Sequence, residues 1–213
     1  MKNNLRKFGL SIFAAVMIAS ASLAQFEGEI IFEKNVGKIH VIYKYFVKGN
    51  DIRIEEVSED GTIDGIQLMD LDTKKSYALS PERKLWFETP NRRPAKSLDV
   101  DIKKTGKTKE VLGKNCFEVI VTNKAQDRKI VYWITKGDYE FFIPMLETLN
   151  RKENQAMFYL ETEGMEDHFP MLSTEHIIST GAVVSTLKAQ KIESKTINAE
   201  TFIIPKDYGK FER

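Results

Sequence analysis

Apolar and polar side chains alternate along most of the chain between Phe26 and Thr135, and this alternation predicts a series of short β-strands. From Phe26 to Glu33, glutamates occupy most of the positions between the apolar ones, as in a strand with one buried face. Turn residues such as Gly49-Asn50-Asp51 separate the segments, and connections this short predict antiparallel neighbours. Further strands are expected at residues 39–47, from Ile52 onward, and at 66–71, 77–79, 85–87, 102–112, 116–122, 129–135, 181–192 and 201–205.

The alternation stops between Tyr139 and Glu163, where apolar residues recur at helical spacing. Pro144 is compatible with the first turn of a helix in this segment. A second short helix or an irregular arm is expected around Phe158, whereas residues 167–177 show no clear period. The pattern predicts a mainly β domain in which a short helical arm lies over a curved antiparallel sheet.

Methionines gather in the same part of the chain. Four of the five that follow residue 24 lie between Met145 and Met171. Methionine is flexible and polarizable, and it packs against apolar partners of variable shape. This segment therefore predicts a lid over an apolar cavity; the alternative is a core helix with a packed connection, in which methionine fills gaps. The candidate ligand-binding side chains are Phe141, Phe142, Met145, Leu146, Leu149, Met157, Phe158 and Met171.

The first 24 residues have the pattern of a cleavable secretory signal peptide. Basic residues up to Lys7 precede an apolar run from Phe8 to Ala19, and small residues follow as far as Ala24. The run has about 12 residues, fewer than the roughly 20 that span a bilayer, so a transmembrane anchor is the less favoured alternative. No cysteine lies directly after the run, where a lipid anchor would be attached. We expect residues 25–213 to be a single periplasmic or secreted domain that spans no membrane.

Charge and cysteine content narrow the function classes. Loss of three basic residues with the signal peptide would leave 29 of the 32 basic residues against 31 acidic ones, a formal net charge of −2. Such a balance argues against nucleic-acid binding, which needs a concentrated basic face. Cys116 is the single cysteine, so the chain forms no intramolecular disulfide. We expect Cys116 to be a small buried side chain in a strand.

Catalytic and metal-binding motifs are missing from the sequence. It contains no Gly-x-Ser-x-Gly nucleophile turn, no phosphate-binding glycine loop and no dinucleotide fingerprint. The histidines are His40, His168 and His176, and the spacing of the last two matches no standard zinc pattern. We therefore expect no catalytic residues, no cofactor and no metal site, and we interpret the protein as a non-enzyme.

Four stretches resemble a known family. They are Gln25–Ile30, Tyr45–Glu55, Leu112–Phe117 and Phe202–Tyr208. Together they resemble an uncharacterised family of exported Gram-negative proteins with a domain of unknown function, which is similar to the LolA/LppX-like lipoprotein-carrier superfamily. The resemblance implies an incomplete antiparallel barrel, with helices over a hollow that holds acyl chains in LolA-like proteins.

Two functions follow from these observations. The first is a periplasmic binding or carrier protein for a lipid, a lipoprotein acyl chain or another apolar ligand, with residues 25–213 forming a half β-barrel. The second is a non-catalytic structural or interaction module of the cell envelope, with a filled core and a protein partner. A ligand that co-purifies with the protein would favour the first.

Overall fold

A computed structural model describes residues 25–90, 98–149 and 152–212. The predicted signal peptide, residues 1–24, and most of the loop expected at residues 90–97 lie outside the described residues. Within the described ranges, twelve strands form one sheet in the order β12-β6-β5-β4-β3-β2-β1-β11-β10-β9-β8-β7. The strands are β1 (Glu27–Val36), β2 (Ile39–Lys48), β3 (Asp51–Val57), β4 (Ile63–Asp70), β5 (Lys75–Ser80), β6 (Leu85–Glu88), β7 (Asp101–Val111), β8 (Lys114–Asn123), β9 (Arg128–Lys136), β10 (His168–Ile177), β11 (Val183–Ser194) and β12 (Gly209–Lys210).

The sheet is an open half-barrel, which confirms the predicted fold class. Its order ends at β12 on one side and β7 on the other, so the sheet does not close on itself. Every pairing within it is antiparallel except that of β12 with β6. The predicted segments between residues 39 and 135 coincide with β2 to β9, within a few residues at each end. Their short turns make sequence neighbours into sheet neighbours.

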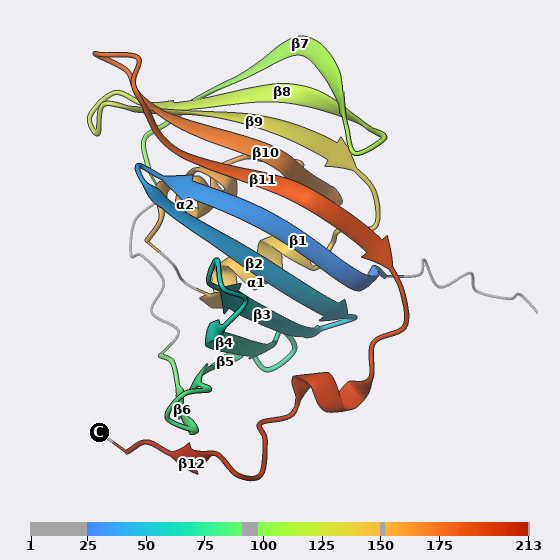
Figure 1. Cartoon of the computed structure of the whole chain (residues 1–213). Helices are drawn as coiled ribbons and strands as arrows, with labels where there is room; N and C mark the ends of the chain where they lie inside the picture. The colour runs from blue at the N-terminus through green and yellow to red at the C-terminus, as the bar shows by residue number, and fades with distance from the viewer. Residues whose placement is uncertain (1–24, 91–97, 150–151, 213) are drawn as a thin grey trace, which may run out of the picture.

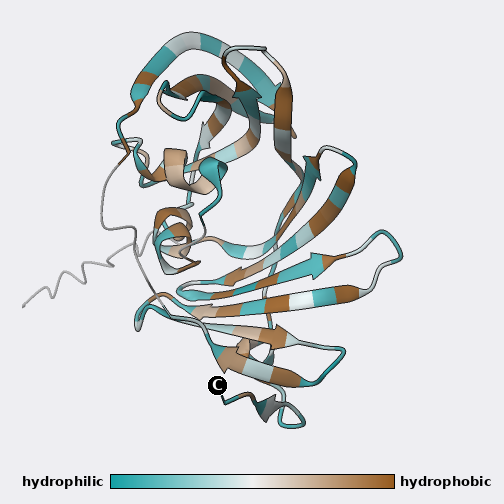
Figure 2. Cartoon of the chain, turned by 90° about the vertical axis from the view of Figure 1, so that its left-hand side faces the viewer, coloured by the Kyte–Doolittle hydropathy of each residue, from teal (hydrophilic) through white to brown (hydrophobic). Residues whose placement is uncertain are grey.

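Two helices, α1 (Phe142–Leu149) and α2 (Asn154–Leu160), lie on the concave side of the sheet (Figures 1 and 2). They occupy the segment where the strand alternation stops, as predicted. Helix α1 approaches β4 and β5, and α2 approaches β10. No helix in the described ranges is long and apolar enough to cross a membrane.

The main core lies between the helices and the concave face. The core forms there because the apolar residues at every second position of a strand point to the same face of the sheet. Ile30 and Phe32 of β1 are 0% and 1% exposed, and Tyr45 and Val47 of β2 are similarly buried. Cys116 is 1% exposed within this core, which confirms its prediction as a small buried side chain.

Strands β1 and β11 approach each other closely at Gly28. A Cβ atom at this position would lie 2.1 Å from the backbone oxygen of Glu193. No real side chain tolerates that distance, so the strands can pair here only because residue 28 is glycine. The register slips once along this pair, between Ile31 and Phe32. Gly28 therefore fixes the contact between an early and a late strand.

The C-terminal segment crosses the convex face below β1 to β3 and reaches the β6 edge (Figure 1). It contains a short 3-10 helix, η1 (Ala199–Phe202). Arg53 of β3 donates a 3.2 Å hydrogen bond to the carbonyl of Thr201, and Lys48 of β2 donates one of 2.7 Å to that of Ile197. Farther on, Ile204 and Tyr208 pack against a second apolar cluster. The buried members of that cluster are Ile66, Leu68 and Leu79.

The C-terminal third departs from the sequence pattern in two places. Strand β10 lies in the segment 167–177, which shows no clear period. A register shift between Pro170 and Leu172 interrupts the alternation there. The strand is nevertheless paired on both sides, with β9 and with β11. Residues 201–205, expected as a strand, instead form the end of η1 and an irregular stretch. Asn198 caps this turn by accepting a hydrogen bond from the backbone N–H of Glu200.

Candidate functional site

The candidate site lies between the concave face and the segment that carries α1 and α2, which we call the helical arm (described residues 142–149 and 152–160). The two helices have 8 and 7 residues. Isolated helices of this length are unstable in water, so the arm depends on its contacts with the sheet. These contacts include hydrogen bonds at α2 and aromatic packing around α1.

Hydrogen bonds attach α2 to β9 and β10. The Tyr132 hydroxyl of β9 donates a 2.8 Å bond to the backbone carbonyl of Gln155. Asn154 donates a 2.7 Å bond from its side-chain amide to the Glu175 carboxylate. At the other end of the helix, the Tyr159 hydroxyl donates to the backbone carbonyl of His168 at 3.2 Å. The orientation of α2 over the sheet is therefore set at both ends.

Stacked and edge-on rings join α1 to the sheet. The ring of Phe142 lies 4.8 Å from that of Phe169 on β10 and 5.2 Å from that of Tyr159 on α2, measured between centroids. Phe141 and Tyr139 extend the same group of rings. Such contacts favour certain ring angles but tolerate sliding better than hydrogen bonds do. Helix α1 is thus held mainly by apolar packing.

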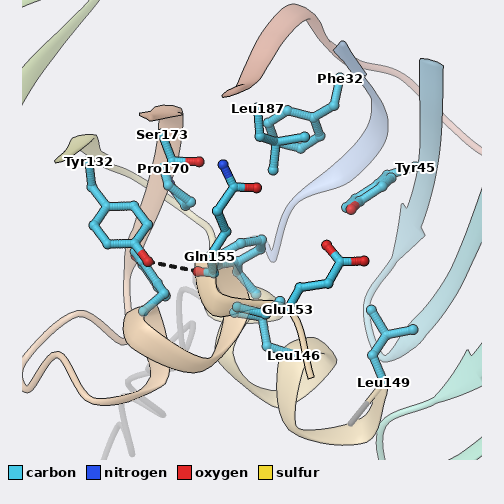
Figure 3. Close-up of a pocket in the computed structure, with 13 residues that line it drawn as sticks. Phe32, Tyr45, Tyr132, Leu146, Leu149, Glu153, Gln155, Pro170, Ser173 and Leu187 are labelled. Carbon is cyan, nitrogen blue, oxygen red and sulfur yellow. Dashed lines mark hydrogen bonds between the residues drawn. The ribbon is translucent and has the colours of Figure 1, made fainter. Parts of the chain in front are cut away.

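A narrow apolar cavity separates the helical arm from the sheet (Figure 3). Its volume is ≈ 50 Å³, which is room for a few water molecules and not for a long acyl chain. Rings and aliphatic side chains form most of the wall, and both layers contribute. The lining residues are Phe32, Tyr45, Tyr132, Phe142, Leu146, Leu149, Glu153, Gln155, Ala156, Tyr159, Pro170, Ser173 and Leu187.

A second, more polar hollow of ≈ 270 Å³ adjoins the first, because Glu153 and Gln155 line both. Lys34 of β1 forms a 2.5 Å ion pair with Glu153 at the boundary. Glu175 is 7% exposed here and accepts hydrogen bonds from Asn154 and Ser185. The concave face therefore changes from apolar under the helical arm to polar at the end near the β1–β2 and β10–β11 turns.

The structure divides the eight predicted ligand-binding residues into two groups. Phe142, Leu146 and Leu149 line the apolar cavity. The other five do not line it and belong to the packed core or its border. Of these, Phe141, Met145, Phe158 and Met171 are fully buried, and Met157 is partly buried against the same core.

Most of the cavity wall escaped sequence reasoning. Phe32, Tyr45 and Leu187 come from strands distant from the helical arm in sequence, and only the fold brings them together. The sequence indicated only that these residues lie on the inward face of an alternating strand. Gln155 had no signal, because a single glutamine in a short helix is unremarkable. Its placement against the sheet is a property of the tertiary structure alone.

The buried tyrosines of this region resist ionisation. Burial raises the pKa of Tyr132 well above its ordinary value, with smaller contributions from Tyr159 and Glu175. Burial likewise raises the pKa of Tyr159, and it raises that of Tyr139 to about 12. Their hydroxyls are therefore neutral hydrogen-bond donors at neutral pH. Burial also raises the pKa of the Cys116 thiol, which makes it a poor nucleophile.

No metal-binding cluster of three or more histidine, cysteine or acidic side chains occurs among the described residues. His168 lies against Asp167, at 2.6 Å between Nδ1 and Oδ1, and stacks edge-on against Phe117. His176 approaches the backbone oxygen of Gly181. The residues of the cavity are suited to non-covalent binding of an apolar group with a few polar contacts.

Comparison with known proteins gives a family and a fold. A family model described as Domain of unknown function (DUF4412) matches residues 26–208, whereas no curated protein matches the chain. An uncharacterized conserved protein from Thermus thermophilus has the same fold, with a TM-score of 0.57 and 9% identity over 90% of this chain and 92% of that one.

Two solved structures are more distant. PNGF-II gives a TM-score of 0.46 at 10% identity over 87% of this chain, but only 30% of PNGF-II is covered. A LolA superfamily protein from Nitrosomonas europaea gives 0.36 at 9% identity, over 85% of this chain and 91% of that one. The similar structures thus include a LolA superfamily protein, as the sequence resemblance suggested, at a distance that says nothing about ligands.

Proposed function

The chain belongs to the DUF4412 family of domains of unknown function, and from this premise we propose that it is an exported, non-catalytic binding or carrier protein for an apolar ligand such as an acyl chain. The proposal rests on the apolar cavity between the helical arm and the concave face of the sheet. The contacts that join these two layers differ between α2 and α1. Hydrogen bonds fix α2, whereas the ring of Phe142 packs α1 against the sheet. The N-terminal sequence pattern supports export to the periplasm or beyond.

Ligand entry requires the helical arm to move. A cavity of ≈ 50 Å³ has no room for an acyl chain. Outward movement of α1 would separate Phe142 and Leu146 from the wall formed by Phe32 and Leu187 and would open a channel along the concave face. A bound chain would then replace the helix–sheet contacts with ligand contacts of similar apolar area, so that opening and binding are coupled.

The second candidate is a structural or interaction module of the cell envelope. The small volume of the apolar cavity favours it, because a filled core needs no ligand for its stability. In that case the helical arm would stay closed and recognition would take place on the outer surface. The two candidates differ in whether the interior of the protein exchanges its contents.

The experiment that separates them begins with native mass spectrometry of the protein purified from its own envelope, followed by solvent extraction. A discrete additional mass that extracts into solvent supports the carrier. A bare polypeptide mass, together with no binding of the neutral dye N-phenyl-1-naphthylamine, supports the interaction module.

A pair of variants tests where the ligand lies. Leu149→Asn places a polar group at the half-buried edge of the cavity, where it should weaken dye binding at least fivefold without unfolding the sheet. Ile203→Asn, at a side chain 59% exposed on the C-terminal segment, is the control and should bind as the parent does. Equal binding by all three proteins would place the ligand elsewhere. Met145 is unsuitable for this test, because a polar group at a fully buried core position destabilises the fold itself.

A further inference from the structure

The side chain of Gln155 occupies an unusual place in the cavity. It is 7% exposed, and its Nε2 atom is fully buried with no hydrogen-bond partner in the described part of the chain. Figure 3 shows the side chain extending from α2 toward Ser173 and Leu187 on the opposite wall. An amide N–H that is removed from water without a partner destabilises a protein by roughly 1–3 kcal/mol. Native proteins rarely keep such a group without a reason.

The backbone that carries this side chain is fixed by two hydrogen bonds. The carbonyl of Gln155 accepts the hydrogen bond from Tyr132, and the preceding residue, Asn154, is bonded to Glu175. These bonds fix the backbone from which the buried side chain extends, and the side chain lies on the border between the apolar cavity and the polar hollow, both of which it lines. A fixed donor at such a border suits a ligand with an apolar tail and an acceptor oxygen at its head.

The surrounding charges select among acceptors. Lys34 is paired with Glu153, whose carboxylate points toward the Tyr45 hydroxyl at the rim of the cavity (Figure 3). Glu175 adds a second carboxylate, which Arg128 approaches at 3.3 Å. Lys34 and Arg128 are thus already matched by carboxylates, and Lys152, which also lines the polar hollow, is exposed to solvent. An anionic head group at Gln155 would meet the Glu153 carboxylate. A neutral oxygen acceptor is favoured.

We propose that Gln155 is the head-group subsite of the cavity and that its amide donates a hydrogen bond to the neutral carbonyl oxygen of an acyl ester or acyl amide. This inference rests on the proposed function and names the ligand class. The acyl chain would run from Gln155 beneath α1, among Phe32, Leu146 and Leu187. Esters and amides share this carbonyl chemistry, so either a glycerolipid or an N-acylated lipoprotein terminus would satisfy the subsite.

Competition against bound N-phenyl-1-naphthylamine tests the subsite with four probes of one chain length: methyl laurate, N-methyl lauramide, laurate and dodecane. In the parent protein we expect the ester and the amide to compete about five- to tenfold better than dodecane, the gain of one hydrogen bond to a neutral acceptor. Laurate should compete less well than methyl laurate at pH 8. If the ester competes better than the amide, the source of the acyl group is a glycerolipid. If the amide competes better, the source is an N-acylated lipoprotein terminus.

Variants then assign the preference to the side chain. Gln155→Met, which keeps the length and removes the donor, should lose the preference for ester over dodecane while dodecane itself competes unchanged. Gln190→Leu, on the exposed side of β11, is the control and should keep it. An ester preference that survives in Gln155→Met, or that is absent from the parent, would overturn the subsite while leaving the carrier function intact. If the parent binds neither the dye nor any probe, the proposed function itself fails.

Discussion

The Tyr132 hydroxyl, which is fully buried, donates its hydrogen bond to the backbone carbonyl of Gln155 and so joins the middle of β9 to the start of α2. Tyr132→Phe would remove this bond between the sheet and the first turn of α2. We expect the free energy of unfolding to fall by about 0.5–1.5 kcal/mol, the contribution of a typical hydrogen bond, measured by urea denaturation. Tyr77→Phe is the matched control, because the Tyr77 ring packs against Trp86 in the second apolar cluster, and it should change the free energy of unfolding by less than about 0.5 kcal/mol. Equal losses would mean that this bond does not stabilise the fold.

The ion pair between Lys34 and Glu153 should restrain local opening at the start of α2 and contribute little to global stability. Glu153 is 42% exposed, so its pair contributes at most about 1 kcal/mol. In Glu153→Gln we expect faster amide hydrogen exchange in α2, with a nearly unchanged urea midpoint. Asp207→Asn removes the exposed pair with Lys84 on the C-terminal segment and should leave exchange in α2 as it was. Unchanged exchange in Glu153→Gln would show that the pair does not restrain the arm.

Alkaline pH should unfold the protein through its buried tyrosines. Tyr132, Tyr139 and Tyr159 all have pKa values raised in the folded state, that of Tyr139 to about 12. Unfolded tyrosine loses its proton near pH 10, so the stability from neutral burial is fully present below pH 10. It is lost as the pH rises toward 12, by up to about 1.4 kcal/mol per pH unit for each tyrosine. Tyrosinate absorbance at 295 nm should therefore rise together with the loss of β circular dichroism; ionisation of all tyrosines in a fully folded protein would contradict this.

Gly28→Ala should separate β1 from β11. The added Cβ would meet the Glu193 backbone oxygen, which cannot move without breaking the strand pair. We expect a loss of about 1–3 kcal/mol in unfolding free energy, the usual effect of overpacking. Gly65→Ala is the control, since a Cβ there meets nothing within 4 Å. A Gly28→Ala protein as stable as the parent would show that the two strands can part at little cost.

The sequence was informative about the fold because its period-two segments are long and their turns short. From Ile39 to Thr135 these local signals were enough to place β2 to β9. They failed at β10, where the register shift at Pro170 breaks the period, and at residues 201–205, where the local cap at Asn198 favours a 3-10 turn over the apolar run. In both places a local feature of the backbone, a register shift or a helix cap, determined the structure rather than the side-chain pattern.

The candidate site was less predictable than the fold, for a physical reason. The apolar spacing of Phe142, Leu146 and Leu149 was visible in the sequence, but the same spacing describes a core helix and a cavity lid. Which of its residues face empty space depends on the strands opposite. Gln155 is the clearest example, since its proposed role rests on the buried Nε2 atom, which has no hydrogen-bond partner among the described residues.

The pairing of β1 with β11 also has a consequence for how the protein folds during its synthesis. Glu29 and Lys195 are joined by a 2.8 Å ion pair although 166 residues separate them along the chain. The ribosome synthesises β1 long before β11, so β1 lacks one of its two neighbours until β11 has emerged. Such distant pairing slows folding, and throughout that delay the nascent chain presents one free edge of an apolar strand to its surroundings. A chaperone that recognises the N-terminal strands therefore has a long window in which to act, and the hollow of the half-barrel is among the last features to form.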